Sequence, residues 1–353
     1  MGALAYAFSD SFWFSAVEGE VYASSSLFTA AVFWAILKWE DVADEQYADR
    51  WLILIAFLMG LSIGVHLLNL LALPAIVLVY YFRKFQFTWK GCTISFGLSV
   101  VLLALLLFGI IPGVVTISTK FDYFFVNTLG MPANSGMVFH MILLAAFLAL
   151  AVMATLRSAN PARSALLSVA ALFLSGVWVL SGSAGLNILV LIAVSGVVWY
   201  LSGKSRIILN TLLMVVAVIM IGYSSTAVIV IRSSAGTPLN ENNPSDPFNL
   251  LYFLNREQYG QRPLFRGAYY NAPVVEYKNG KPRIVLEGDK YIRTGYDLER
   301  VYDPRFITLF PRVWSDQEDH AQVYEEWGRI NGTPVQVTDE QTGEKTIIRK
   351  PKF

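Results

Sequence analysis

Apolar and polar positions alternate along the chain in long blocks rather than residue by residue. Eight apolar blocks, separated by charged or turn-forming residues, fall within the first 231 of the 353 residues. A membrane-crossing helix needs roughly 20 mainly apolar residues. The pattern therefore predicts eight membrane spans, over about 21–39, 51–64, 67–82, 93–112, 137–156, 164–181, 185–202 and 207–231.

The second and third blocks are short and nearly continuous, so they could form one span or two. As one helix, their joint run of about 32 residues would be about 48 Å long at 1.5 Å per residue. That length exceeds a hydrocarbon core of about 30 Å. A tight turn near Gly64 would instead give two short spans, and we predict this helical hairpin.

Charges in the short loops decide the orientation. With eight spans, one side holds only Lys120, and the other holds nine basic residues: Lys38, Arg50, Arg83, Lys84, Lys90, Arg157, Arg163, Lys204 and Arg206. Basic loops stay in the cytoplasm. With a single span over 51–82, Arg83, Lys84 and Lys90 would lie outside, so the charge bias favours two spans.

Composition divides the chain into a membrane-like part and a soluble-like part. Residues 1–232 carry 11 Lys/Arg and 9 Asp/Glu, whereas the much shorter segment 233–353 carries 16 and 17. We expect a transmembrane domain over 1–232 and a small α+β domain over 233–353, which the orientation places outside the cytoplasm. No basic patch suggests a nucleic-acid partner. The single cysteine, Cys92, excludes an intrachain disulfide.

Local signals predict the elements of the second domain. Asp246-Pro247 has an N-cap residue followed by proline at the first helical position, so a helix should begin there and run over FNLLYFLNREQYG. Asn279-Gly280 lies between two β-rich runs and predicts a hairpin turn. The stretch PVQVTDEQTGEKTIIR predicts a second hairpin.

Two carboxylates, Glu18 and Glu20, stand just before the first span. Their spacing places them on opposite sides of a helix but on one face of an extended segment. One interpretation is structural, because acidic residues near a helix N-terminus are favoured by its dipole by about 0.3–1 kcal/mol. The functional interpretation is that they face a polar cavity at the outer membrane surface. There they could bind a divalent metal, a sugar hydroxyl or an acceptor hydroxyl.

Other polar residues fall at the same outer level. Tyr22 opens the first span, and His66 and Asn69 lie at the predicted hairpin, where an interfacial cap and a ligand contact are both open. Arg232 closes the last span and either snorkels to the interface or binds a lipid phosphate. The aromatic segment 119–137 should lie on the bilayer surface or roof a site. His140 reads as structural or interfacial, and the three histidines show no metal-ligand spacing.

Several stretches resemble a known family. They are FWFSAVEGEVYASSSLFTA, GLSIGVHLLNLLALPA, FFVNTLGMPANSG and the long IGYSSTAVIVIRSSAGTPLNENNPSDPFNLLYFLNREQYGQRPLFRGAYYNAP. The chain resembles an uncharacterised multi-pass membrane family, found mainly in Bacteroidota, that is similar to protein O-mannosyltransferases of the glycosyltransferase C superfamily. The resemblance extends over essentially the whole chain.

The resemblance implies a glycosyltransferase of the bacterial inner membrane with a periplasmic C-terminal domain. Its partners would be membrane lipid, a polyprenyl-phosphate sugar donor and a protein or glycan acceptor, with protein Ser/Thr as one option. Glu18 and Glu20 fit the superfamily's second outer loop and are the candidate catalytic residues. Tyr22, His66, Asn69 and Arg232 are the candidate substrate-binding residues. A divalent metal is a possible cofactor.

The chain also departs from that family. The family has further spans and an acidic first outer loop before this region, and it continues past Phe353. The resemblance therefore implies an internal fragment that lacks transfer activity alone. The rival hypothesis is a non-enzymatic transporter or assembly scaffold. Transporters commonly place ionisable residues near the bilayer midplane, whereas the polar residues here gather at the outer surface.

Overall fold

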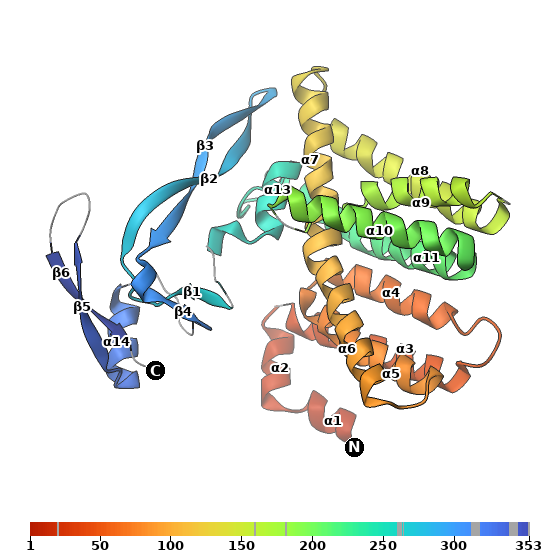
Figure 1. Ribbon diagram of the computed structural model, residues 1–353, viewed down its shortest axis with the longest axis horizontal. Helices are drawn as coiled ribbons and strands as arrows, with labels where there is room; N and C mark the ends of the chain where they lie inside the picture. Colours follow the sequence, from red (N-terminus) through yellow and green to blue (C-terminus); the bar gives the residue numbers. More distant parts are fainter. Residues whose placement is uncertain are drawn as a thin grey trace. The chain divides into compact units, whose positions relative to one another are not determined.

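The computed structural model describes residues 1–19, 21–158, 160–180, 182–259, 263, 265–311, 318–338 and 345–351. Two compact units divide the chain, Met1–Asn255 and Arg256–Phe353 (Figure 1). The regular elements described in the first unit are all helices, and the strands lie in the second unit. The chain is thus mostly helical, with a small strand region at its C-terminal end.

The helices of the first unit follow the predicted apolar blocks closely. Their bounds are α1 Gly2–Ala7, α2 Asp10–Val17, α3 Tyr22–Val42, α4 Arg50–Ile63, η1 Leu67–Ala72, α5 Leu73–Lys84, α6 Trp89–Ala104, η2 Leu105–Ile110, α7 Ile111–Asn127, α8 Ser135–Arg157, α9 Pro161–Leu174, α10 Ala184–Lys204, α11 Arg206–Tyr223, η3 Ser224–Thr226, α12 Ala227–Ser233 and α13 Pro247–Leu254. Each of the eight predicted blocks contains a helix.

Several of these helices are long and apolar enough to cross a membrane. Over the described residues there are five such runs, Leu67–Lys84, Trp89–Asn127, Ser135–Arg157, Ala184–Lys204 and Arg206–Ser233. Helices α2 and α3 pass the same test only as a pair bent by 114°, and α4 and α9 are apolar but shorter. A membrane protein is therefore plausible, and the number of crossings stays a prediction.

Helix α3 runs parallel to η1–α5, and α4 returns the chain between them. At one end, the rings of Tyr22 and His66 lie 5.7 Å apart, and at the other end Trp39 stacks on Tyr80 at 5.0 Å. Because α3 and α5 point in the same direction, α4 must run in the opposite direction between them. The break that separates α4 from η1 includes Gly64, so the predicted turn near that residue is confirmed.

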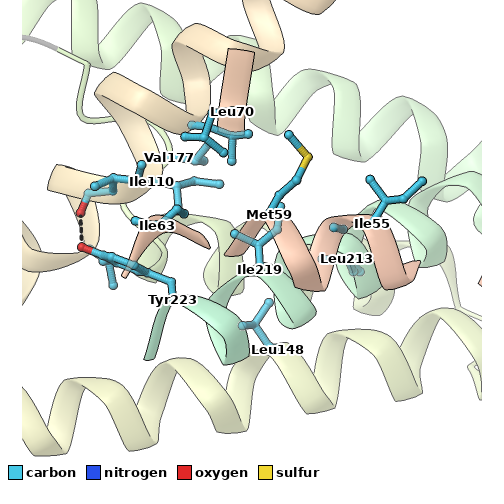
Figure 2. Packing of buried hydrophobic residues seen from close by; sticks show 14 of the residues in the cluster. Ile55, Met59, Ile63, Leu70, Ile110, Leu148, Val177, Leu213, Ile219 and Tyr223 are labelled. Atoms are coloured by element: carbon cyan, nitrogen blue, oxygen red, sulfur yellow. Dashed lines mark hydrogen bonds between the residues drawn. The ribbon is translucent and has the colours of Figure 1, made fainter. Parts of the chain in front are cut away.

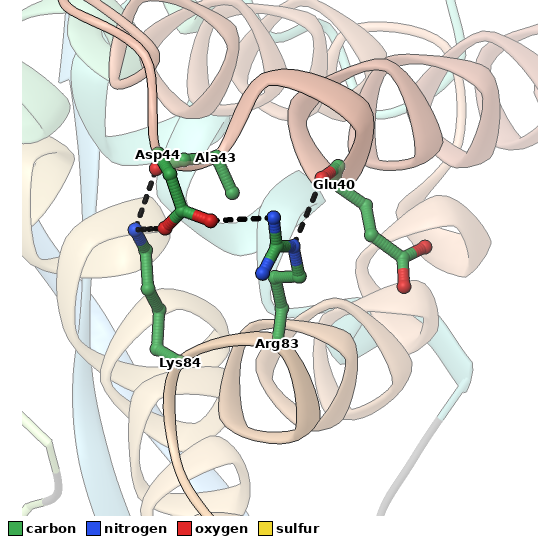
Figure 3. A network of polar contacts seen from close by, with 5 residues as sticks. All are labelled: Glu40, Ala43, Asp44, Arg83 and Lys84. Atoms are coloured by element: carbon green, nitrogen blue, oxygen red, sulfur yellow. Dashed lines mark hydrogen bonds and ion pairs between the residues drawn. The ribbon is translucent and has the colours of Figure 1, made fainter.

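A network of charges ties the far ends of α3 and α5 together (Figure 3). The Asp44 carboxylate accepts from Arg83 Nη2 at 2.6 Å and from Lys84 Nζ at 3.0 Å. Arg83 Nε also donates to the Glu40 carbonyl at 3.1 Å, and Lys84 donates to the Ala43 carbonyl. The hydrogen bond from Lys84, together with the charge of Arg83, lowers the pKa of Asp44. Two loops that the charge pattern assigned to one side of the membrane are therefore in contact.

Helices α4 and α11 also run parallel, with their backbones in direct contact. A Cβ atom on Gly60 would lie 2.4 Å from the Ile219 carbonyl oxygen, and one on Gly222 would lie 2.4 Å from the Leu61 nitrogen. Glycine permits this approach because it has no side chain, a common device between membrane helices. Around the contact, side chains of α4 and α11 pack into the buried core, and Tyr223 donates to the Ile111 carbonyl at 3.0 Å (Figure 2).

The segment 119–137 differs from its prediction. Its first half is not a separate surface segment but the end of one continuous helical run, Trp89–Asn127, that includes α6, η2 and α7. A run of 39 residues is about 58 Å long, well beyond a bilayer core. The aromatic residues therefore belong to a helix end that packs against α8 and α13.

The middle of this run is a π-helix, η2, just before Pro112. Proline has no N–H group to donate to the carbonyl four residues earlier, which gives the helix a reason to widen there. Close packing also marks this place, since a Cβ atom on Gly113 would lie 2.2 Å from the Gly176 carbonyl oxygen. The segment after α9 is thus pressed against the long helix.

The stretch after α12 is fixed by side-chain hydrogen bonds. Ser233 Oγ donates to Asn240 Oδ1 at 2.8 Å, and Asn240 Nδ2 donates back to the Ser233 carbonyl at 3.1 Å. Asp246 caps α13 as predicted, accepting from the Phe248 and Asn249 amides at 2.9 and 3.2 Å. This stretch and α13 belong to the first compact unit, whereas the composition shift lies at 232/233. The assignment of 233–353 to an extracytoplasmic domain stays a prediction.

The described residues of the second unit form three strand pairs, one α-helix and two short 3-10 turns. Its elements are η4 Glu257–Tyr259, β1 Arg266–Ala268, β2 Val274–Glu287, β3 Lys290–Tyr302, η5 Pro304–Phe306, β4 Ile307–Leu309, α14 Glu318–Gly328, β5 Gly332–Thr338 and β6 Lys345–Pro351. Three antiparallel pairs, β1–β4, β2–β3 and β5–β6, are formed by the described residues. The last pair confirms the hairpin predicted for the C-terminal stretch.

The hairpin predicted at Asn279-Gly280 is wrong. Strand β2 continues through these residues, and β3 pairs with it from one end to the other. Asn279 lies instead at a register shift within the ladder, before Pro282. The chain turns at Gly288, whose φ of 59° is in the left-handed region that favours glycine. The partner strand decided the position of the turn, and a two-residue motif could not reveal it.

Polar contacts hold α14 and η5 to their neighbours in the second unit. Tyr270 donates to Glu325 on α14 at 2.9 Å, and burial, followed by this carboxylate, raises the pKa of the tyrosine. Arg305 in η5 donates to both carboxylate oxygens of Asp303, the N-cap of that turn, and this hydrogen bonding lowers the pKa of Asp303. Arg305 Nη1 also donates to the Gln336 carbonyl of β5 at 3.2 Å.

Candidate functional site

Two of the predicted substrate-binding residues meet where α3 begins. Tyr22 is the first residue of α3 and is half exposed. His66 is the extended N-cap residue of η1, and its Nδ1 accepts the Leu68 amide at 3.1 Å. In a neutral imidazole whose Nδ1 accepts, Nε2 carries the proton. His66 thus caps η1, and whether it also contacts a ligand or the membrane interface stays a prediction.

Asn69 lies one turn further along and is fully buried. Its Nδ2 donates to Ser62 Oγ at 3.1 Å, and Ser62 in turn donates to the Met59 carbonyl at 2.8 Å. The Asn69 Oδ1 atom has no hydrogen-bond partner among the described residues. Ser62 was not singled out from the sequence, since serine is common in apolar helices and bonds to its own backbone there.

Ser25 is a second buried polar residue at this end of α3. Its side chain is 2% exposed, and its Oγ has no hydrogen-bond partner within the described part of the chain. A helical serine usually bonds to the carbonyl one turn earlier. Helix α3 packs against η1, so Ser25 and Asn69 come from neighbouring elements. The run of three serines at 24–26 was the available sequence signal, but it did not show which serine is buried.

The C-terminal end of α11 lies at the same end of the helical bundle. A Cβ atom on Gly64 would lie 2.6 Å from Ser225 Oγ, so the turn after α4 touches η3. Arg232 lies further along, in the last turn of α12, and is exposed. None of the described hydrogen bonds or ion pairs joins it to Tyr22, His66 or Asn69. Its grouping with those residues stays a prediction.

Of the two candidate carboxylates, the structure describes Glu18 but not Glu20. Glu18 is exposed and follows α2 as its C-cap, so it lies at the end of one helix rather than directly at the start of the next. The dipole of α2 does not favour a carboxylate there. Gly19 follows in the left-handed region with φ 71°. Glu20 lies outside the described residues, and its place in the site stays a prediction.

A second polar cluster joins α7, α8 and α13, and the sequence did not suggest it. Asp122 is fully buried near the end of α7 and accepts the amides of Asn134, Gly136 and Met137, at 2.8–3.2 Å. Its carboxylate therefore caps α8. Asn134 has φ 71°, and its side chain donates to the Ser245 carbonyl at 2.9 Å. The signal that could have revealed this cap was an isolated aspartate at the close of an apolar run.

Asp246, the cap of α13, is only 2% exposed. Burial raises its pKa, hydrogen bonds from Asn249 and Phe248 oppose that shift, and the negative charge of Asp122 adds to it. A carboxyl whose pKa is raised on folding stabilises the fold below its unfolded pKa. That contribution is lost as the pH rises through the folded value.

We expect Asp246→Asn to keep the helix cap and to remove the free-energy cost of burying an ionised carboxylate. Asparagine caps helices as well as aspartate does, whereas alanine typically costs about 1 kcal/mol. Asp246→Asn should therefore melt at or above the wild-type temperature at pH 7, and Asp246→Ala should melt below it. Thermal unfolding in detergent at pH 5 and pH 7 measures both. A cap that depends on its charge would instead make Asp246→Asn the weaker variant at pH 7.

His140 has a structural role, in line with one of its two interpretations. It is fully buried, with Nδ1 2.9 Å from Ser118 Oγ and Nε2 3.0 Å from the Leu174 carbonyl oxygen. Among the described residues, no group of three or more His, Cys, Asp or Glu side chains could hold a metal ion. A divalent metal therefore stays a prediction, and no step below depends on one.

One apolar hollow of about 410 Å³ lies elsewhere, between α8, α9 and α10. Leu143, Phe147 and Leu166 are typical of its lining, and Ser195 is its polar residue. It has no group that could perform acid–base chemistry. The polar cluster at the start of α3 and η1 is therefore the better candidate site.

Two family models match separate parts of the chain. Residues 1–89 match the protein O-mannosyl-transferase TMEM260 N-terminal domain, and residues 260–353 match a family of unknown function (DUF8416). No curated protein and no solved structure matches the chain. The resemblance to O-mannosyltransferases is thus confirmed for the N-terminal region. That region includes α1 to α5 and every residue of the cluster around Tyr22 and His66.

Proposed function

We propose that this chain is part of a membrane glycosyltransferase that moves a sugar from a polyprenyl-phosphate donor to an acceptor hydroxyl at the outer membrane surface. The observation that carries the proposal is that the O-mannosyl-transferase match covers the helices that bring Tyr22 and His66 together and bury Asn69 close by in η1. The apolar helices around this cluster suit a donor whose lipid tail stays in the bilayer.

The reaction needs a base and a way to receive the leaving phosphate. A carboxylate, Glu18 or Glu20, takes the proton from the acceptor hydroxyl as its oxygen attacks the anomeric carbon. The bond between that carbon and the phosphate oxygen breaks, and the polyprenyl phosphate leaves with the electron pair. His66 orients the ligand in this proposal. Its Nδ1 accepts a hydrogen bond from the Leu68 amide, so its Nε2–H group can donate to the ligand.

We propose that the chain crosses the membrane eight times and that the second unit lies outside the cytoplasm. Support comes from helix directions: α3 and α5 run parallel, as do α4 and α11, which alternating crossings require. The contact of Asp44 with Arg83 and Lys84 adds to this support, because it joins two loops that the charge rule places in the cytoplasm. In this placement the membrane is the bacterial inner membrane and the second unit is periplasmic.

Cysteine labelling tests the placement. In a Cys92→Ser background, Glu45→Cys should resist a membrane-impermeant maleimide in intact spheroplasts, and Asp289→Cys should react. Both positions are exposed, so access to reagent rather than burial decides the result. After detergent lysis both should react, which serves as the control. Labelling of position 45 in intact spheroplasts would overturn the orientation.

The function itself is tested by transfer. The complete protein, purified in detergent with lipid, is incubated with radiolabelled polyprenyl-phosphate mannose and a Ser/Thr-rich acceptor peptide. Labelled peptide that forms only with the protein is the expected result. If a range of polyprenyl-phosphate sugars and acceptors gives no product, and the protein instead moves a solute across proteoliposomes, the transporter hypothesis is the better one.

A further inference from the structure

The second unit carries an apolar tip at one end of the β1–β4 ladder. We define this tip by Phe265, Arg266, Leu309 and Phe310. Arg266 lies opposite Leu309 in the register of the ladder, and the Phe310 amide donates to the Phe265 carbonyl at 2.7 Å, which extends the pairing by one residue. The two phenylalanine rings are in contact, with their centroids 6.1 Å apart. Three bulky apolar side chains and one arginine thus lie together at the end of the ladder.

The tip is exposed, whereas the other end of the ladder is buried. Phe265, Leu309 and Phe310 are 72%, 69% and 66% exposed. At the other end, Ala268 and the neighbouring Phe306 are 4% and 0% exposed. A single exposed apolar side chain is ordinary on a protein surface, but a contiguous group of them marks a place of contact with a protein or a membrane.

The backbone of the tip holds the rings in place. Phe310 has a φ of 54°, in the left-handed region that residues other than glycine seldom adopt. A Cβ atom on Gly267 would lie 2.2 Å from Pro263 Cγ and 3.2 Å from Pro311 Cγ, so two prolines pack on the backbone beside the tip. A rare backbone conformation that the surrounding structure maintains is typical of functional positions. The exposed rings are therefore presented in a fixed geometry.

The chemistry of the tip and its link to the first unit select a lipid surface as the partner. Residues 265–268 and 307–311 include Arg266 and no acidic residue. Aromatic rings suit the headgroup level of a membrane, and a guanidinium group suits a phosphate. Phe265 follows Asn255, the last residue of the first unit, by ten positions, and ten residues span at most about 36 Å. This short link gives the tip a high effective concentration near a membrane that holds the first unit.

We propose that the β1–β4 tip docks on the surface of the membrane that contains the first unit. The rings of Phe265 and Phe310 enter the region where headgroups meet acyl chains, and Arg266 binds a lipid phosphate. So few apolar side chains would hold a free domain only weakly, and the covalent link to the first unit supplies the second anchor. The proposal depends neither on sugar transfer nor on the side of the membrane that the second unit occupies.

Quenching of a fluorescent label locates the tip. In a Cys92→Ser background, Leu309→Cys is labelled with a nitrobenzoxadiazole dye, and the complete protein is placed in nanodiscs of phosphatidylglycerol and phosphatidylcholine. Ile347→Cys on β6 is the matched control, because Leu309 and Ile347 are both 69% exposed. The label at position 309 should be quenched by lipid that carries a nitroxide near its headgroup and protected from iodide in the water. The label at position 347 should show the reverse.

Three results of this experiment would overturn the proposal. Iodide quenching at position 309 that is as strong as at position 347 means that the tip lies in water. Protection of position 309 from both quenchers means that protein covers the tip, either the first unit or a second copy of the chain. Lipid quenching of equal strength at both positions means that docking is not specific to the tip.

Substitution of Phe310 separates docking from folding. Asparagine adopts a positive φ more readily than phenylalanine does, so Phe310→Asn should melt at or above the wild-type temperature in detergent. It should also lose most of the lipid quenching at position 309, because one of the two rings is gone. Leu298→Asn on β3 is the control, since Leu298 is as exposed as Phe310, at 66%, and this variant should keep the quenching. Equal lipid quenching in the two variants would show that the rings do not hold the tip on the membrane.

Discussion

Gly60→Leu should prevent the first unit from folding stably. A Cβ atom at this position would lie 2.4 Å from the Ile219 carbonyl oxygen and 2.8 Å from the Ile219 Cα atom. Both atoms belong to backbone and cannot rotate away, so α4 and α11 must separate. Overpacking a core costs about 1–3 kcal/mol and occasionally more. We expect a loss of at least about 3 kcal/mol, because separation also unpacks Met59 and Ile63 from the core.

A matched glycine provides the control. Gly97 lies within α6, and a Cβ atom there would meet nothing within 4 Å. Gly97→Leu should therefore fold and melt like the wild type or slightly higher, because glycine is a poor helix former by about 1 kcal/mol. Thermal unfolding in one detergent compares the two variants. Equal melting temperatures for Gly60→Leu and Gly97→Leu would show that α4 and α11 are not in backbone contact.

Glu20→Gln should abolish transfer while leaving the fold intact. General acid–base groups typically contribute about 10²–10⁴-fold to a rate, and glutamine has the size of glutamate without its basicity. We choose Glu20 because it lies two residues before Tyr22, whose ring contacts that of His66. The measurement is the initial rate of sugar transfer by the complete protein, together with its melting temperature.

Glu18→Gln is the matched control for that experiment. Glu18 is exposed at the C-cap of α2, where its charge gains nothing from the helix dipole, so its loss should hardly change stability. We expect a smaller loss of rate for Glu18→Gln than for Glu20→Gln. If both variants keep full activity, neither carboxylate is the base.

The elements of the first unit could be predicted because each depends on local sequence. Apolar blocks bounded by loops produced the helices, the length of the run over 51–82 required the break near Gly64, and Asp246-Pro247 set the start of α13. These are properties of a few consecutive residues. The segment 119–137 was misjudged because its aromatic content resembles that of an interfacial helix, whereas in the structure its first half extends α7.

Pairing between distant segments could not be predicted in this way. An apolar helix in a bilayer is apolar all round, so the sequence does not indicate which face meets a neighbour. The contact of Gly60 with Ile219 emerges only when the helices are packed. The turn at Gly288 has the same origin, because β3 selected it over Asn279-Gly280.

The candidate site was predicted in part. Tyr22 and His66 are neighbours, and Asn69 is buried one turn away with an unpaired oxygen. Ser25 and Ser62 were missed, because neither is distinguished from the other serines of the apolar blocks. Arg232 is not joined to the cluster by any described contact, and the role of Glu20 depends on residues beyond those the structure describes.

Photocrosslinking tests most directly whether the lipid-linked donor binds at the start of α3. Tyr22 is replaced by p-benzoylphenylalanine, and the complete protein is irradiated with radiolabelled polyprenyl-phosphate mannose. The control carries the same group at Trp89, which is 80% exposed and follows the end of α5 that contacts Asp44. The account predicts a labelled adduct at position 22 that excess unlabelled donor removes, and none at position 89. No competable adduct at position 22, or equal labelling at both positions, would contradict it.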